Sequence, residues 1–226
     1  MTGSAKRATG ARNPRYRHVP EAVTSAAGQE AIDLAASAGL WLDPWQQDVL
    51  HGALGERADR RWAASRVGLI VPRQNGKNAI LEARELAGIY LFGERLITHT
   101  AHRVDTSLEH FERMKALIEE TPHLDAELDD VSEANGKEGL VFTGGRRLNF
   151  KARSKGSGRG FTGDCVVLDE AYYLYDLGGL IPTMSARPNP QLWYTSSAPL
   201  ARLESDRLRA LCTRGRALAT GALQAA

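Results

Sequence analysis

One short segment of the chain has the residue types that bind a polyphosphate. It covers residues 71–78 and reads Val-Pro-Arg-Gln-Asn-Gly-Lys-Asn, at the end of an apolar, β-branched run. A tight loop that opens a helix offers converging backbone N–H groups to phosphate oxygens, and a lysine at the helix start adds positive charge. We therefore predict that Gly76 lets the backbone approach a nucleoside triphosphate and that Lys77 binds its β and γ oxygens.

The segment departs from the generic phosphate-loop pattern G-x-x-x-x-G-K-[ST] at two positions. Val71 replaces the first glycine, and Asn78 replaces the final hydroxyl residue. The side-chain oxygen of Asn78 is a weaker but suitable ligand for Mg²⁺. A helix that merely begins with Gly-Lys is the alternative interpretation, so this motif alone does not decide the matter.

Two adjacent carboxylates, Asp169 and Glu170, follow directly after the apolar run Cys165–Leu168. Carboxylates at the end of a strand project at the carboxyl edge of an open α/β sheet, where ligands bind. By the logic of phosphoryl transfer, we expect Asp169 to hold Mg²⁺ and Glu170 to orient and polarise the attacking water. A helix-capping turn is the alternative. The pair follows the phosphate loop by about 90 residues, which favours hydrolysis of a nucleoside triphosphate.

The elements that must position these residues alternate along the chain. Short apolar runs predict strands, and apolar residues at helical spacing predict helices. Asp43 before Pro44 marks a helix start, and Asp105 is expected to cap a later helix. The pattern predicts an α/β fold, a P-loop NTPase whose mostly parallel central sheet is flanked by helices on both faces. The predicted strands are 67–71, 96–100, 165–168 and 192–195 with a hairpin of 140–142 and 147–151, and the predicted helices are 29–38, from 44, from 77 up to Gly93, and 105–118.

The composition excludes several classes of protein. The 226 residues are 42% hydrophobic and 25% charged, with a net charge of +2, which is close to an average globular domain and unlike a collagenous, disordered or membrane-spanning chain. Cys165 and Cys212 are too few for a disulfide framework, and a reducing compartment is the default. The N-terminal residues are basic but carry no apolar core, so they are not a secretory signal.

Basic residues concentrate in two segments that contain no acid. Such segments raise the local potential toward phosphates. A solvated tail and a solvated loop are the alternative interpretation. The first segment holds Lys6, Arg7, Arg12, Arg15 and Arg17, and the second holds Arg146, Arg147, Lys151, Arg153, Lys155 and Arg159.

Taken together, the motifs resemble the large terminase subunit of tailed bacteriophages, in its HK97-like branch, and specifically its N-terminal ATPase domain. In that family the phosphate loop lacks the first glycine and has an arginine just before it, as Arg73 is here. The resemblance covers about residues 40–215. It is carried by residues 71–78, 166–171, 42–46 (Leu-Asp-Pro-Trp-Gln), 195–198 (Thr-Ser-Ser-Ala) and 157–160 (Ser-Gly-Arg-Gly).

The resemblance implies roles for further residues. Gln46 would read the adenine edge with Trp45 packed nearby, Ser196 would belong to the motif that senses the γ-phosphate, and Arg159 would be supplied to the ATP of a neighbouring subunit. Each has an alternative. Trp45 as a core aromatic, residues 195–197 as a strand-to-turn connection, and Arg159 as a DNA contact all stay open. Gln74 and Asn75 would bind the nucleotide with the rest of the loop, and Arg73 would contact the γ-phosphate or only position the loop.

Two other groups of polar residues stay outside these motifs. Arg103, at the end of the second predicted strand, is a candidate for contact with DNA or with nucleotide. His99 and His102 are interpreted as structural, because no carboxylate or second histidine at a ligand spacing makes a metal site with them.

The expected protein is a Mg²⁺-dependent ATPase that drives double-stranded DNA into a procapsid, with ATP and Mg²⁺ as its ligands. Both basic segments are then expected to face DNA phosphates without reading sequence. The resemblance implies a homo-oligomeric ring on the portal protein, a small terminase subunit as partner, and a place in the host cytoplasm without membrane contact. A helicase-like DNA-dependent ATPase, or a nucleotide-binding or portal-docking module without turnover, is the alternative. We expect a basic arm at 1–27, the ATPase domain at 28–215 and an alanine-rich tail at 216–226. No acidic residue follows Asp206, so a nuclease domain is not expected.

Overall fold

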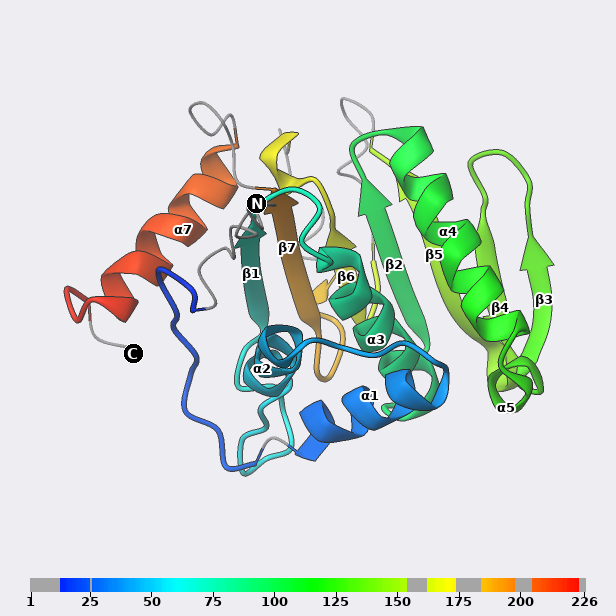
Figure 1. The fold of residues 1–226 in the computed structure, drawn as a ribbon, viewed down its shortest axis with the longest axis horizontal. Coiled ribbons are helices and arrows are strands. Elements are labelled where there is room, and N and C mark those ends of the chain that lie inside the picture. Colours follow the sequence, from blue (N-terminus) through cyan, green and yellow to red (C-terminus); the bar gives the residue numbers. More distant parts are fainter. Residues whose placement is uncertain (1–12, 25, 154–161, 174–183, 198–204, 224–226) are drawn as a thin grey trace, which may run out of the picture.

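The structure is a computed structural model that describes residues 13–24, 26–153, 162–173, 184–197 and 205–223. Its strands are β1 (Arg66–Val71), β2 (Leu96–Ala101), β3 (Leu128–Ser132), β4 (Gly139–Phe142), β5 (Arg146–Ala152), β6 (Cys165–Leu168) and β7 (Gln191–Ser197). Within the described ranges they form a seven-stranded sheet in the order β1-β7-β6-β2-β5-β4-β3 (Figure 1). Neighbours from β1 to β5 in this order are parallel, whereas β4 pairs antiparallel with β5 and with β3.

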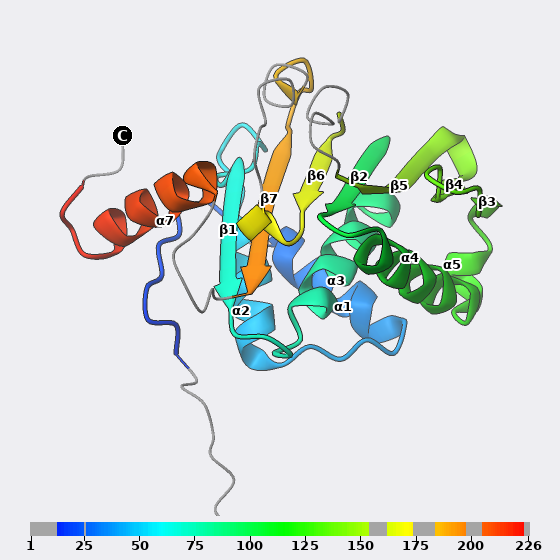
Figure 2. The ribbon, with the colours of Figure 1, turned by 90° about the horizontal axis from the view of Figure 1, so that it is seen from above.

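The helices lie on both faces of this sheet. They are α1 (Ala26–Ser37), α2 (Pro44–Ala53), α3 (Lys77–Tyr90), α4 (Val104–Glu119), the short α5 (Pro122–Asp125) and α7 (Asp206–Ala219), with 3₁₀ turns at Thr143–Gly145 and Ala171–Tyr173. α1 packs against α2 and α3, and α4 packs against β2 and β5, so α1 to α4 cover one face (Figure 2). α7 packs beside β1 on the other face. The predicted fold class is confirmed.

Each face of the sheet has its own apolar cluster. Along β6, Cys165 and Val167 join the cluster beneath α1 to α4, whereas Val166 and Leu168 join the cluster beneath α7. Alternate residues of a strand point to opposite faces, so a strand that is apolar throughout is buried on both sides. The burial of β6 therefore fixes Asp169 at the carboxyl end of a strand in the middle of the sheet.

The predicted strands and the 140–151 hairpin are present, and Asp43 is the N-cap of α2 as predicted. The prediction for Asp105 is wrong, because the N-cap of α4 is Arg103 and Asp105 lies in the first turn. A carboxylate distant in sequence accepts from the amides at this helix start, as described below, which a local pattern does not reveal. β3, α5 and α7 were not among the predicted elements. No helix in the described ranges is both long enough and apolar enough to span a membrane.

Candidate nucleotide-binding site

The loop between β1 and α3 has the backbone shape of an anion-binding turn. The loop consists of residues 72–76, which are all exposed and connect Val71 to Lys77. The backbone is left-handed at Gln74, with φ of 58°, and at Gly76, with φ of 75°. A turn of this kind points successive backbone N–H groups into one concavity, and the positive end of the α3 dipole adds to it. The loop therefore fits a phosphate group.

The side chain of Lys77 extends from this loop to the end of β6. Its Nζ donates to Asp169 Oδ1 and, at 3.2 Å, to Asn78 Oδ1. Only 14% of the Lys77 side chain and 4% of the Asp169 side chain are exposed. Burial by itself would raise the pKa of Asp169, but the Lys77 ammonium lowers that pKa below its ordinary value. The structure thus brings the lysine and both expected metal ligands into contact.

Thr195 is a member of this site, although the sequence analysis placed it in the 195–198 motif and gave the role in that motif to Ser196. Its hydroxyl donates to Asp169 Oδ1 over 2.8 Å, and the backbone N–H of Glu170 donates to the same oxygen over 2.7 Å. Ser196, the residue predicted from the coupling motif, instead donates from Oγ to the carbonyl of Ser197 at 3.1 Å. Side chains alternate between the two faces of the sheet, so Thr195 lies on the same face as Trp193, Val167 and Asp169, and Ser196 lies on the opposite face. That alternation was the available signal.

Glu170 lies next to Asp169 in an uncommon backbone conformation, with φ of 51°. Its carboxylate accepts from the backbone N–H groups of His102 and Arg103, at 3.1 and 3.3 Å, and from the Thr106 hydroxyl at 3.4 Å. The side chain therefore lies at the start of α4, one strand away from Lys77. A negative charge at this position is favourable because the amides and the dipole of α4 both face it.

Gln46 reaches the phosphate loop from α2. Its Oε1 accepts from the backbone N–H of Asp43 at 2.6 Å, and its Nε2 donates to the carbonyl of Gly76 at 2.8 Å. A Cβ at position 76 would lie 2.7 Å from Gln46 Nε2, which adds a second reason for glycine besides the positive φ. Trp45, in contrast, is partly buried against the main apolar cluster. Both polar atoms of Gln46 are engaged within the protein.

Two arginines of the second basic segment turn into the protein, whereas the predicted contact with DNA would require them to face outward. The Arg146 guanidinium donates to the carbonyls of Ile89 and Thr143 and pairs with Glu127. The Arg153 guanidinium donates to backbone carbonyls beside the acidic pair, and burial lowers the pKa of Arg153 to about 10. For these two arginines the prediction of DNA contact is wrong, because internal acceptors occupy them. Arg73, Arg103 and Arg147 are exposed.

Some predicted residues lie outside the described part of the chain. They are Lys155, Arg159 with the rest of residues 157–160, Ala198, and the basic residues Lys6, Arg7 and Arg12.

A second polar cluster lies beneath the site, between α3, β2 and α4. Glu85 Oε1 is hydrogen-bonded to His99 Nδ1 at 2.7 Å, and Glu85 Oε2 is hydrogen-bonded to His110 Nε2 at 2.8 Å. The two histidine rings stack with their centroids 3.9 Å apart. The sequence spacing around His99 showed no carboxylate or second histidine as a partner, but Glu85 and His110, 14 and 11 positions away, reach it through the fold. Because each ring nitrogen is bound to a different oxygen of one carboxylate, the arrangement is an internal ion-pair network.

The pKa values of all three residues in this cluster are shifted from their ordinary values. Burial tends to raise the pKa of Glu85, but His110 and His99 lower it to about 2. Burial lowers the pKa of His99, whereas the pKa of His110 is raised because Glu85 outweighs its burial. Below the raised pKa of His110, the arrangement is thus an ionised Glu85 paired with a protonated His110, and the lowered pKa of His99 favours the neutral form of that ring.

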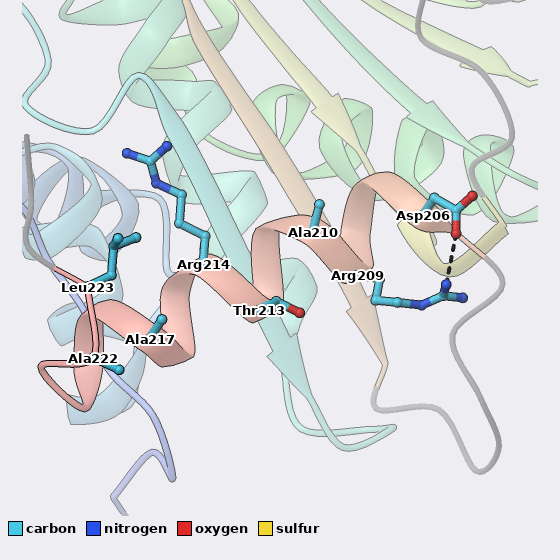
Figure 3. A pocket seen from close by; sticks show the side chains of 8 residues that line it. All are labelled: Asp206, Arg209, Ala210, Thr213, Arg214, Ala217, Ala222 and Leu223. Atoms are coloured by element: carbon cyan, nitrogen blue, oxygen red, sulfur yellow. Dashed lines mark hydrogen bonds and ion pairs between the residues drawn. The ribbon is translucent and has the colours of Figure 1, made fainter.

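A shallow hollow of about 620 Å³ lies elsewhere, on the outer face of α7 (Figure 3). Its lining includes Asp206 and Arg209, which form an ion pair of 2.9 Å, together with small side chains such as Ala210 and Ala217. None of the phosphate-loop residues lines it. It is therefore separate from the candidate site.

The fold is shared with known phage proteins. The chain is similar to the large terminase of bacteriophage HK97, with a TM-score of 0.59 and 17% identity over 75% of this chain and 37% of that one. It is also similar to the large terminase ATPase domain of Thermus phage P74-26, with a TM-score of 0.55 and 18% identity over 75% of this chain and 70% of that one. A mutant of the latter domain gives a TM-score of 0.56 at 17% identity.

No family model and no curated protein matches the sequence. The chain spans little more than a third of the HK97 protein, 37% of its length. The structural likeness therefore establishes that the chain has the fold of a large terminase ATPase domain.

Proposed function

We propose that this chain, which has the fold of the ATPase domain of phage large terminases, is the ATP-hydrolysing motor domain of a DNA-packaging terminase. The observation that supports this best is the contact between Lys77 and Asp169, which joins the phosphate loop to the acidic pair. A lysine and a metal-binding carboxylate must meet across one triphosphate in a phosphoryl-transfer site. Had the two lain on opposite sides of the sheet, the proposal would have no basis.

In this proposal the chain's own residues bind and orient the substrate. The left-handed turn at Gln74 and Gly76 would receive phosphate oxygens on its N–H groups. Lys77 would leave Asp169 and donate to β and γ oxygens. Asn78 and Asp169 would hold Mg²⁺, which when bound neutralises charge on the phosphate oxygens.

The proposed role of Glu170 is to orient the attacking water, but in the structure its carboxylate is bound to the amides at the start of α4. It would have to rotate its side chain away from the α4 amides to orient a water molecule for attack. Rotation about side-chain bonds is a small motion, and the bonds to be exchanged are long, at 3.1 to 3.4 Å. Turnover in this proposal therefore includes a side-chain switch at Glu170.

The finer parts of the function rest on the resemblance in sequence. Double-stranded DNA would be moved into a procapsid by a homo-oligomeric ring on the portal protein, in the host cytoplasm and with a small terminase subunit as partner. Arg159 would complete the charge stabilisation at a neighbour's site. Among the described basic residues, the exposed Arg103 and Arg147 are better placed for DNA phosphates than Arg146 or Arg153.

The experiment that tests the proposal measures release of phosphate from ATP with Mg²⁺, with and without double-stranded DNA. We expect Lys77→Ala to abolish hydrolysis and the exposed Lys137→Ala to leave it unchanged. Equal rates for parent and Lys77→Ala would refute an ATPase in favour of a module without turnover. Strand displacement of a DNA fork would favour the helicase-like alternative.

A further inference from the structure

The end of β5 carries an arginine whose side chain turns inward across the sheet. Arg153 is the first residue after β5, and its backbone N–H donates to the carbonyl of Ala101 at 2.8 Å, so it continues the parallel pairing with β2. Its side chain then crosses β2 toward β6. The residue thus connects the carboxyl ends of three strands that lie side by side in the order β6-β2-β5.

The guanidinium group is occupied by acceptors on these neighbouring strands. One terminal nitrogen donates to the Thr100 carbonyl at 2.9 Å and to its hydroxyl oxygen at 2.7 Å. The other donates to the carbonyl of Asp169 at 2.5 Å and to that of Glu170 at 3.3 Å. The Thr100 hydroxyl in turn donates to the carbonyl of Val167 at 2.9 Å. A charged donor makes hydrogen bonds that are stronger than those between neutral groups.

Two successive carbonyl groups reach one nitrogen here because the residue between them curls the backbone. Glu170 is that residue, and its φ of 51° is in the left-handed region that side chains other than glycine rarely adopt. Such a conformation persists only where the surroundings hold it. On the carbonyl side, Arg153 supplies this restraint, and on the amide side the N–H of Glu170 donates to Asp169 Oδ1.

The Arg153 side chain is largely buried although one of its nitrogens is unpaired within the described residues. Its Nε is inaccessible to solvent and has no hydrogen-bond partner within the described residues, so the group is held inside the protein at a cost. A solvent-facing cation for DNA would not be buried in this way. The burial is explained if the arginine is needed where its four bonds end, two at Thr100 and two at the backbone carbonyls of the acidic pair.

We propose that Arg153 is a positioning residue that holds the backbone of Asp169 and Glu170 in the conformation from which the Glu170 side chain is aimed. The inference deepens the proposed function and rests on it for its effect on turnover. It does not depend on turnover for its structural effect. With Arg153 in place, Glu170 reaches the α4 amides in the absence of nucleotide and rotates from there; without it, the left-handed backbone relaxes and the carboxylate moves off its target.

The first test reads the position of Glu170 directly, in the full chain and without nucleotide. Amide hydrogen exchange at His102 and Arg103, measured by NMR, reports whether the Glu170 carboxylate still accepts from them. We expect Arg153→Gln to accelerate exchange at these two amides by about tenfold, as the reference variant Glu170→Ala does, while amides in β1 stay unchanged. Arg95→Gln, at the opposite end of β2 and exposed, is the matched control and should leave all of them unchanged.

The second test uses hydrolysis of ATP. We expect Arg153→Gln to lower kcat by about tenfold or more with KM for ATP within about threefold, because the phosphate loop does not contact this arginine. Arg153→Lys, which keeps the charge and one donor, should recover part of the loss. If Arg153→Gln does not fold, Thr100→Val removes one acceptor of the guanidinium and should raise exchange at His102 and Arg103 to a smaller degree.

The outcomes separate the two proposals. Unchanged exchange at His102 and Arg103 in folded Arg153→Gln and Thr100→Val would overturn the positioning role. A rise in KM as large as the fall in kcat would overturn it as well, since it would indicate a general loss of the site. If the parent chain hydrolyses no ATP, the proposed function fails, whereas the exchange experiment still decides what Arg153 does.

Discussion

At the scale of single residues, Glu170 carries the sharpest functional prediction. Glu170→Gln keeps an oxygen that can accept from His102 and Arg103, so the fold should be preserved, but an amide cannot polarise water. We expect kcat to fall by about 10²-fold or more, with ATP affinity unchanged. Phosphate release measured beside the exposed control Glu109→Gln checks this. A variant as fast as the parent would remove Glu170 from the mechanism.

The buried cluster of Glu85, His99 and His110 gives a prediction on stability. Glu85→Gln removes the carboxylate that both histidine rings bind, and breaking a buried, hydrogen-bonded pair from one side costs about 3–5 kcal/mol. Chemical denaturation at neutral pH should show this loss. The exposed Glu109→Gln, one residue from His110 on the same helix, should change the free energy of unfolding by less than about 0.5 kcal/mol.

The same cluster predicts how stability depends on pH. The pKa of Glu85 is lowered from 4.5 to about 2, so its contribution is present above pH 4.5 and is lost as the pH falls toward 2. The lowered pKa of His99 removes stability as the pH falls below 6.5, since only the unfolded chain takes up that proton. The raised pKa of His110 acts oppositely: its contribution is full below 6.5 and is lost as the pH rises through its folded pKa.

A variant isolates the contribution of His99 to this pH dependence. An asparagine at this position can donate to Glu85 in place of Nδ1 but does not titrate. We expect His99→Asn to lose less stability than the parent between pH 6.5 and 5, measured by urea unfolding across that range. An identical slope in both proteins would show that His99 does not stay neutral in the fold.

At the scale of elements, α2 is tied to the phosphate loop through one side chain. Gln46→Ala removes the bond to Asp43 at the helix start and the bond to Gly76 in the loop, whereas Gln47→Ala removes a bond to the Leu42 carbonyl alone. Both variants should lose about 1 kcal/mol of stability. Only Gln46→Ala should weaken nucleotide binding, by several-fold, as measured by titration calorimetry. Equal affinities would make the contact a fold-level feature without influence on the site.

The helices and strands that could be predicted from the sequence are those whose apolar pattern follows directly from their burial. β1 and β6 are apolar because both faces of the sheet are covered, and α3 has apolar residues at helical spacing. These three elements were therefore predictable, and so was the carboxyl edge of the sheet at which β1 and β6 end. β3 reads Leu-Asp-Asp-Val-Ser and is largely exposed at the sheet edge, so no apolar pattern marks it. The parallel topology alone predicts that Lys77 and Asp169 lie at the same edge of the sheet.

Charged residues were predicted less well than apolar ones. Arg146 and Arg153 belong to an acid-free basic segment, and such a segment favours a solvated, DNA-facing surface. Their partners are backbone carbonyls and Glu127, which leave no signature in the neighbouring sequence. The Glu85 cluster was missed for the same reason, because its members come from three separate elements.

At the scale of the whole molecule, the proposed ring makes a prediction about mixtures. If Arg159 acts on a neighbour's ATP, then Lys77→Ala and Arg159→Ala subunits are each inactive alone but complementary, since the first supplies the arginine and the second an intact site. We expect the mixture to recover hydrolysis that rises with protein concentration. The separate variants, assayed at the same total concentration, are the controls. No recovery in a mixture shown to co-assemble would contradict an arginine supplied in trans.

The ion pair between Lys77 and Asp169 would also make the proposed nucleotide site selective. A bare anion that drew Lys77 toward itself would strand a carboxylate that is 4% exposed and has lost its counter-ion. A ligand that brings a divalent cation along with its phosphates compensates both groups at once. In the proposed cycle, phosphate without a divalent cation should therefore bind poorly, and release of the product would let Lys77 and Asp169 pair again.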